Sequence, residues 1–273
     1  MVVCNPHSFG VNMQIEPLDI LPLWLFFISS TGLGLLAMEI GYRMGKKSQS
    51  MSPVEKEGPV GAMVGSTLGL LAIILAFTFN LAASRFDARR HAVLEEANAI
   101  GTTWLRARLL PEPNQSKICD LLGEYVDLRI RMVLDGTIQE GLKESGILHE
   151  KLWQQLKIVT NTSSSPFMAG LFMQSLNQVI DLHAKRVFVG LHNRIPFPIW
   201  MALIILEVIG MIGMGYQSGL SATRRSPMMM FLAIAFSSIL FLIVDLDRSQ
   251  EGFLRVSQQA LVDLQHQFQH SRL

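Results

Sequence analysis

The stretch PVGAMVGSTLGLLAIILAFTFNLAA, residues Pro59–Ala83, decides the fold of this chain. It contains no charged side chain, and its polar residues are few and small. A helix needs about 20 predominantly apolar residues to cross roughly 30 Å of hydrocarbon. Because lipid offers the backbone no hydrogen bonds, a helix is the simple way to cross it. The stretch therefore predicts a membrane-spanning helix.

Three other stretches have the same character, at about 20–41, 197–216 and 227–244. The chain is 49% hydrophobic and only 16% charged, whereas soluble domains average about 25% charged residues. The charged residues are concentrated between Arg85 and Arg194. We therefore predict an all-α integral membrane protein, in which four transmembrane helices form two hairpins and an extramembrane helical middle domain joins them.

The middle domain is predicted to be helical because its apolar residues recur at three- and four-residue spacings. The second span is expected to continue as one helix to about Leu110, where Pro111 and Pro113 follow. Further helices are predicted at 115–134, at 147–159, from Pro166 onward and, in the tail, at 257–269. The predicted segments are an N-terminal tail (1–19), a transmembrane hairpin (20–84, spans 20–41 and 59–83), the helical domain (85–196), a second transmembrane hairpin (197–245, spans 197–216 and 227–244) and a C-terminal amphipathic tail (246–273).

The positive-inside rule gives a direction to the spans. Residues 1–19 contain no Lys or Arg, whereas the two hairpin loops are basic through Arg43, Lys46, Lys47, Lys56, Arg224 and Arg225. This bias predicts cytoplasmic hairpin loops. Basic residues also flank the membrane on the opposite side, at Arg85, Arg89, Arg90, Lys185, Arg186 and Arg194. These residues favour the reverse orientation, so both directions stay open.

Small residues recur along one face of the second span. Gly61, Gly65 and Gly69 are four residues apart, and the same face continues through Ala72, Ala76, Asn80 and Ser84. Small side chains let two helix backbones approach closely in a membrane. The three glycines are therefore candidates for helix packing, within the chain or between subunits. An alternative is that this face lines a narrow path to which Asn80 offers polar contacts.

Aromatic and basic residues lie beside that face, at Phe77, Phe79, Arg85 and Arg89. Apolar side chains at a constriction can gate a pore by dewetting, and arginines at its mouth raise the local anion concentration. These residues, with Asn80, are candidates for a pore and its constriction. The alternative is that the phenylalanines face lipid or core and the arginines mark the membrane interface.

Glu207 lies near the middle of the third span, and that span contains no cation. A carboxylate is costly in hydrocarbon. Glu207 is therefore expected to be protonated, paired or facing water, with arginines of the second span as possible partners.

The motifs of common enzymes are absent from the sequence, which contains no zinc-binding His-Glu-x-x-His, no nucleophile elbow and no phosphate-binding loop. His91 and Glu95 share a helix face, but a solvated pair is the more common interpretation of that spacing. Cys4 and Cys119 are too few for a disulfide framework or a zinc site. We expect no enzyme, no metal, no cofactor and, with a net charge of +1, no nucleic-acid partner.

Two stretches, LAFTFNLAASRFDARR at Leu75–Arg90 and EEANAIGTTWLRA at Glu95–Ala107, resemble bacterial membrane proteins of the bestrophin-like domain family. The resemblance extends over nearly the whole chain, through Leu110–Pro113, Glu124–Arg129, Asp245–Arg248 and Gly252–Ser257. It implies a bacterial inner-membrane location.

A more distant similarity relates this family to bestrophins, which are pentameric anion channels. The matching positions are Phe77, Phe79, Asn80, Arg85, Phe86 and Arg89. The similarity implies a homo-oligomer in the lipid bilayer, with the second span lining a pore for chloride or other anions. Asp245 and Asp247 correspond only loosely to the acidic calcium clasp of animal bestrophins.

Two functions are therefore expected as alternatives. The first is an oligomeric anion channel whose pore is lined by the second span. The second is a non-conducting membrane scaffold or signalling protein, whose helical domain binds a partner protein.

Overall fold

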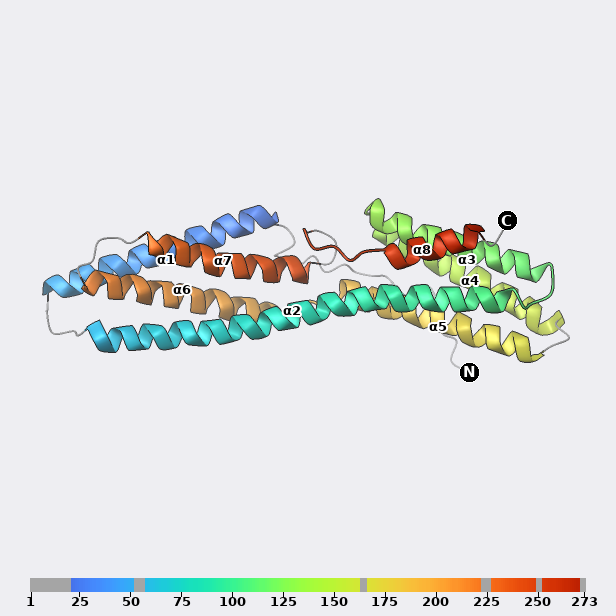
Figure 1. Ribbon diagram of the computed structural model, residues 1–273, viewed down its shortest axis with the longest axis horizontal. Coiled ribbons are helices and arrows are strands. Elements are labelled where there is room, and N and C mark those ends of the chain that lie inside the picture. The colour runs from blue at the N-terminus through green and yellow to red at the C-terminus, as the bar shows by residue number, and fades with distance from the viewer. Residues whose placement is uncertain (1–20, 52–56, 163–165, 222–226, 249–251, 271–273) are drawn as a thin grey trace. The chain divides into compact units, whose positions relative to one another are not determined.

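A computed structural model describes residues 21–51, 57–162, 166–221, 227–248 and 252–270. All regular structure in these ranges is α-helical, which confirms the predicted all-α class (Figure 1). The helices are α1 (Leu23–Met51), α2 (Glu57–Ala107), α3 (Asn114–Leu134), α4 (Ile138–Thr162), α5 (Pro166–Leu191), α6 (Phe197–Leu220), α7 (Met228–Asp247) and α8 (Gln259–His270).

Four helices, α1, α2, α6 and α7, have the length and apolar composition to cross a membrane. The chain divides into two compact units, and α2 contributes to both of them. The membrane unit contains the described parts of Ile15–Phe86 and Arg194–Leu254. The extramembrane unit contains Asp87–Asn193 and the described part of Arg255–Leu273. The second unit includes α3, α4, α5 and α8.

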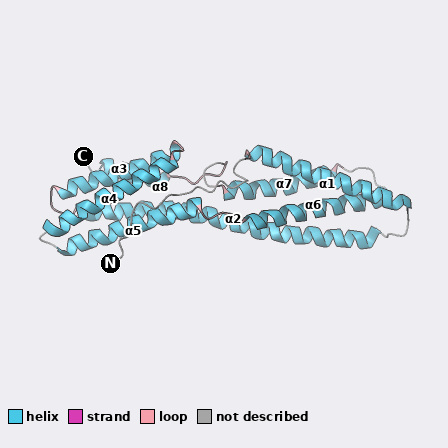
Figure 2. Ribbon diagram, turned by 180° about the vertical axis from the view of Figure 1, so that it is seen from behind, coloured by secondary structure: helices cyan, strands magenta, loops and turns pink. Residues whose placement is uncertain are grey.

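Within the membrane unit, α1 and α6 make the most extensive contact between helices (Figures 1 and 2). Glycines form the crossing. A Cβ on Gly41 would lie against the backbone of Ile212, and one on Gly215 would lie against the carbonyl oxygen of Met38. Gly45 and Gly219 are in similarly close contact with the facing backbone. Backbone-to-backbone packing of this kind is the usual use of small residues between membrane helices.

The extramembrane unit has its own apolar core. α2 to α5 contribute fully buried residues to it, such as Ile100, Leu122, Leu152 and Leu176. The amphipathic α8 packs on this core through Leu261, Leu264 and Phe268, and the Phe268 ring stacks on Trp104 at a centroid distance of 4.7 Å.

Some helix ends differ from the expected ones. α1 continues to Met51, beyond the predicted end of the first span at residue 41. α4 begins at Ile138, directly after the turn at Gly136 (φ +72°), whereas the sequence predicted a start at Ile147. Polar residues and glycines hide the helical pattern over that first part. Lys56, Arg224 and Arg225, on which the predicted orientation depends, lie outside the described residues, as do residues 1–19.

Candidate functional site

The membrane part of α2 has one buried side and one exposed side. Its buried side carries Val64, Leu71, Leu75, Thr78 and Ala82. The opposite side carries the small residues singled out in the sequence, and those from Gly65 onward are exposed: Gly65, Gly69, Ala72, Ala76, Asn80 and Ser84. The small-residue face of α2 therefore lies on the surface of a single chain.

Of the three candidate packing glycines, Gly61 has different surroundings from Gly65 and Gly69. A Cβ on Gly61 would lie 2.6 Å from Nε2 of Gln217, so Gly61 packs against α6. A Cβ on Gly65 or Gly69 would meet nothing within 4 Å. Helix packing within the chain therefore explains Gly61 but neither Gly65 nor Gly69.

Phe77 and Phe79 are both exposed on α2, at 72% and 38%. They are two residues apart and therefore point to different sides of the helix, and Asn80 follows them. These three candidate pore residues are thus available to a partner, to lipid or to an aqueous path.

The two candidate arginines have different environments. Arg85 is mostly buried in the membrane unit, with Nη1 at 3.8 Å from Oδ1 of Asp247. Arg89 belongs to the extramembrane unit and is only 5% exposed. Neither side chain is freely displayed on the surface of a single chain.

Asp247 and Arg248 connect the end of α7 to two other segments of the membrane unit. Oδ1 of Asp247 accepts a hydrogen bond of 3.0 Å from the backbone N–H of Ile195, and the backbone oxygen of the same residue accepts one of 3.1 Å from Nη1 of Arg194. The neighbouring Arg248 donates to the backbone oxygen of Leu21. These contacts join the C-terminal end of α7 to the segments that lead into α6 and α1.

Glu207 is buried at 2% exposure between α1, α6 and α7. Its Oε1 lies 3.5 Å from the hydroxyl of Ser30, which in turn lies 3.2 Å from the hydroxyl of Ser237. Within the described residues, no arginine of α2 forms an ion pair with it, although the sequence suggested one. In the described part of the chain, serine hydroxyls, and not an arginine of α2, therefore lie beside the carboxyl group of Glu207.

Sequence reasoning missed the main polar cluster of the extramembrane unit, which surrounds Glu96. Glu96 is fully buried and its carboxylate receives Nη2 of Arg129 at 3.2 Å, the hydroxyl of Tyr125 at 2.7 Å, and Nη1 of Arg186. Burial alone would raise the pKa of Glu96, but the charges of Arg129 and Arg186 lower it to about 2. Glu96 is therefore ionised and holds α2, α3 and α5 together.

Two histidines complete this cluster. Nδ1 of His183 lies 3.0 Å from the Tyr125 oxygen, and the His183 and His149 rings meet edge to face at 4.9 Å. Tyr125 gives its single hydroxyl proton to Glu96, so His183 must be the donor to Tyr125. Burial lowers the pKa of His149 to about 4, and burial with the nearby Arg129 lowers that of His183 to about 3. Both rings are therefore neutral at pH 7.

This cluster predicts acid sensitivity of the extramembrane unit. The folded-state pKa values of His149 and His183 lie below the ordinary 6.5, so their contribution to stability is complete above pH 6.5 and falls as the pH drops toward 4. At 1.36 kcal/mol per pH unit, we expect each histidine to lose about 2 kcal/mol between pH 6.5 and 5. Thermal unfolding followed by circular dichroism measures this loss. His149→Phe should flatten the pH dependence; a slope equal to that of the original chain would contradict the assignment.

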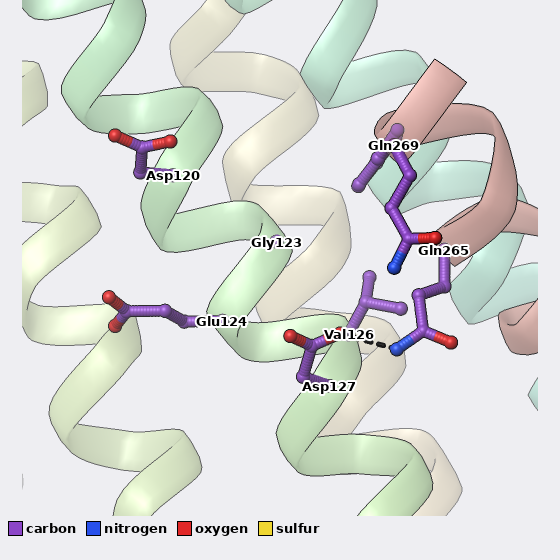
Figure 3. Close-up of a pocket in the computed structure, with 8 residues that line it drawn as sticks. Asp120, Gly123, Glu124, Val126, Asp127, Gln265 and Gln269 are labelled. Atoms are coloured by element: carbon purple, nitrogen blue, oxygen red, sulfur yellow. Dashed lines mark hydrogen bonds between the residues drawn. The ribbon is translucent and has the colours of Figure 1, made fainter. Parts of the chain in front are cut away.

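A depression between α3 and α8 has a volume of about 290 Å³. Asp120, Glu124 and Asp127 line it, and Figure 3 shows Asp127 bound by Gln265, whose Nε2 donates to it at 2.7 Å. The described residues contain no group of three side chains suited to a metal ion. Glu95 forms a pair of 2.6 Å with Lys185 instead of joining His91. Within the described residues, the Glu95 carboxylate is thus paired with Lys185.

Four apolar helices and a separate helical unit define an integral membrane protein. A family model described as the bestrophin-like domain matches residues 29–261. The chain therefore belongs to the bestrophin-like family, as its resemblance predicted. Neither a curated protein nor a solved structure matches it.

Proposed function

We propose that several copies of this chain assemble into an anion channel in the bacterial inner membrane, with the membrane part of α2 around the pore. The observation that carries the proposal is the exposed small-residue face of α2. Lipid contact would favour large apolar side chains there, whereas Gly65 and Gly69 suit a close approach of backbones. Convergence of this face between copies explains glycines that have no neighbour within the chain.

The polar members of the same side support a path for ions. Asn80 and Ser84 are exposed on a helix that otherwise has the composition of a membrane span. An amide or hydroxyl facing lipid is unfavourable, and such groups usually face a bundle interior or water. The exposed Phe77, within one turn of Asn80, supplies an apolar ring that can narrow the path.

The charge at one end of this unit supports selection of anions. The described cluster around Asp247 contains three arginines, Arg85, Arg194 and Arg248, and two carboxylates, Asp245 and Asp247. Among these five described side chains, the positive groups exceed the negative groups by one. A net positive region at a pore mouth raises the local concentration of anions.

Flux through liposomes tests the proposal. Phe77→Ala is expected to raise chloride flux severalfold, because it removes the ring that narrows the path. Phe231, which is 59% exposed on α7, is the matched control, and Phe231→Ala should conduct like the original chain. Arg85→Glu is a less suitable test because it would place a second carboxylate beside Asp247.

Unchanged flux in an assembled Phe77→Ala protein would remove Phe77 from the pore. Absence of flux under every ion gradient would favour the second candidate, a scaffold whose extramembrane unit binds a protein. Exposed apolar residues of that unit, such as Leu105 (60%), Leu109 (61%) and Phe167 (73%), favour this alternative.

We further propose that the hairpin loops face the cytoplasm. Arg43, Lys46 and Lys47, near the end of α1, support this orientation. Side-specific labelling of a Lys47→Cys variant tests it, and labelling from the opposite side would reverse the topology.

A further inference from the structure

The chain folds back along α7 after that helix ends at Asp247. The backbone N–H groups of Phe253 and Leu254 donate to the two carboxylate oxygens of Asp245, at 2.8 and 3.2 Å. Asp245 lies on α7, two residues before its end, and is 1% exposed. One buried carboxylate thus holds the segment Gly252–Leu254 beside the last turn of a membrane helix.

Glycine is required where this segment turns back. Gly252 has a φ of +147°, which side-chain-bearing residues rarely adopt, and a Cβ there would lie against Oδ1 of Asp245. The reversal of the chain at this point therefore depends on glycine at position 252.

The ring of Phe253 packs beside α7, on the side of its end that lies toward the middle of the helix. Its centroid lies 6.1 Å from that of Phe241, and the Phe241 ring packs edge to face on Phe27 at 5.9 Å. Phe241 precedes the end of α7 by six residues, which is about 9 Å along a helix axis at 1.5 Å per residue. Phe253 is thus directed back along the apolar helix.

Despite these contacts, Phe253 is 81% exposed and Leu254 is 41% exposed. Leu242, which follows Phe241 on α7, also has an exposed apolar side chain (38%). Exposure of a large apolar side chain to water is unfavourable. The two side chains therefore extend a surface that, on a membrane helix, is covered by lipid.

We propose that Gly252–Leu254 is a lipid anchor, in which Phe253 and Leu254 enter the bilayer beside α7. Its partner is the interfacial layer of the same membrane that α7 crosses, where aromatic side chains are favoured. The anchor adds a membrane contact outside the four spans and fixes the depth at which α7 ends. It rests on the membrane assignment of α7 and is independent of channel activity.

Spin-label accessibility tests this anchor in the full chain, reconstituted in vesicles of phosphatidylcholine and phosphatidylglycerol. Cys4 and Cys119 are first replaced by serine, and a nitroxide is then attached to Phe253→Cys. The lipid reference is Ile239→Cys in the middle of α7, and the water reference is Leu134→Cys, which is 75% exposed at the end of α3. Collision with oxygen reports lipid, and collision with a water-soluble nickel chelate reports solvent.

The label at 253 is expected to give an oxygen-to-nickel ratio close to that at 239 and severalfold above that at 134. A ratio like that at 134 would place Phe253 in water and overturn the proposal. Low collision with both reagents would show that a neighbouring copy covers the segment, and would also overturn it. Because Phe253 is so exposed, its replacement should not unfold the chain, and Leu254→Cys provides an independent second position.

Discussion

Glu96→Ala is expected to lower the stability of the extramembrane unit by about 3–5 kcal/mol, the usual cost of breaking a buried ion pair by removing one partner. The cost is high because Arg129 and Arg186 would remain buried without their carboxylate. Tyr125 would also lose the acceptor of its hydroxyl proton. For a unit of this size, the loss corresponds to a fall in melting temperature on the order of 10 °C. Circular dichroism measures it.

The adjacent Glu95 provides the matched control. Its pair with Lys185 is exposed on both sides, at 45% and 53%, and exposed pairs contribute roughly 0–1 kcal/mol. Glu95→Ala should therefore melt close to the original chain. Equal losses of stability in Glu95→Ala and Glu96→Ala would contradict a stabilising role for the buried ion pairs of Glu96.

A second variant separates charge from shape. If uncompensated arginine charge dominates the cost, replacing Arg129 by Met in the Glu96→Ala chain should recover part of the lost stability. An additive or larger loss would assign the cost to packing instead.

The sequence predicted the four spans and the helical class because both follow from local patterns. A run of apolar residues such as Pro59–Ala83 predicts a membrane-spanning helix whatever packs against it. Membership of the bestrophin-like family was also predicted, from motifs within Leu75–Ala107. The spans, the helical class and the family motifs are all determined by residues that lie close together in the sequence.

The Glu96 cluster was missed because it depends on neighbours in space. Glu96 is preceded by Glu95, and the residue types alone do not distinguish the two charges. A signal did exist, since Ala92, Val93, Ala97 and Ile100 place Glu96 on the apolar face of its helix. Tyr125 and Arg129, four residues apart, share a face with Leu122 in the same way. Charges on an apolar stripe indicate a buried pair, but only a structure identifies the partner.

The glycines also show that the sequence does not identify the partner in a packing contact. The sequence indicated close packing at Gly61, Gly65 and Gly69, while the closest backbone crossing within the chain uses Gly41, Gly45, Gly215 and Gly219. Both pairs of helix-crossing glycines have the Gly-x-x-x-Gly spacing, so the pattern was present. A spacing shows that a helix can be approached closely, but it does not identify the helix that approaches.

Gly215→Leu is expected to separate α1 from α6 and to lower the stability of the membrane unit by on the order of 3 kcal/mol or more, at the upper end of the cost of overpacking. Even a Cβ at this position would lie against the carbonyl oxygen of Met38, and a backbone atom cannot move aside as a side chain does. Unfolding in sodium dodecyl sulfate, followed by circular dichroism, measures the loss.

Gly65→Leu is the matched control, because a Cβ there would meet no atom within 4 Å in a single chain, in contrast to Gly215. It should leave resistance of the fold to sodium dodecyl sulfate unchanged. If the small-residue face of α2 lies between copies, the same variant should instead shift the detergent-solubilised particle to a smaller size in light scattering. A stable fold with reduced assembly would separate the two uses of glycine, within the chain at 215 and between chains at 65. A stable fold with unchanged assembly would place Gly65 away from the subunit contact and count against α2 as the pore helix.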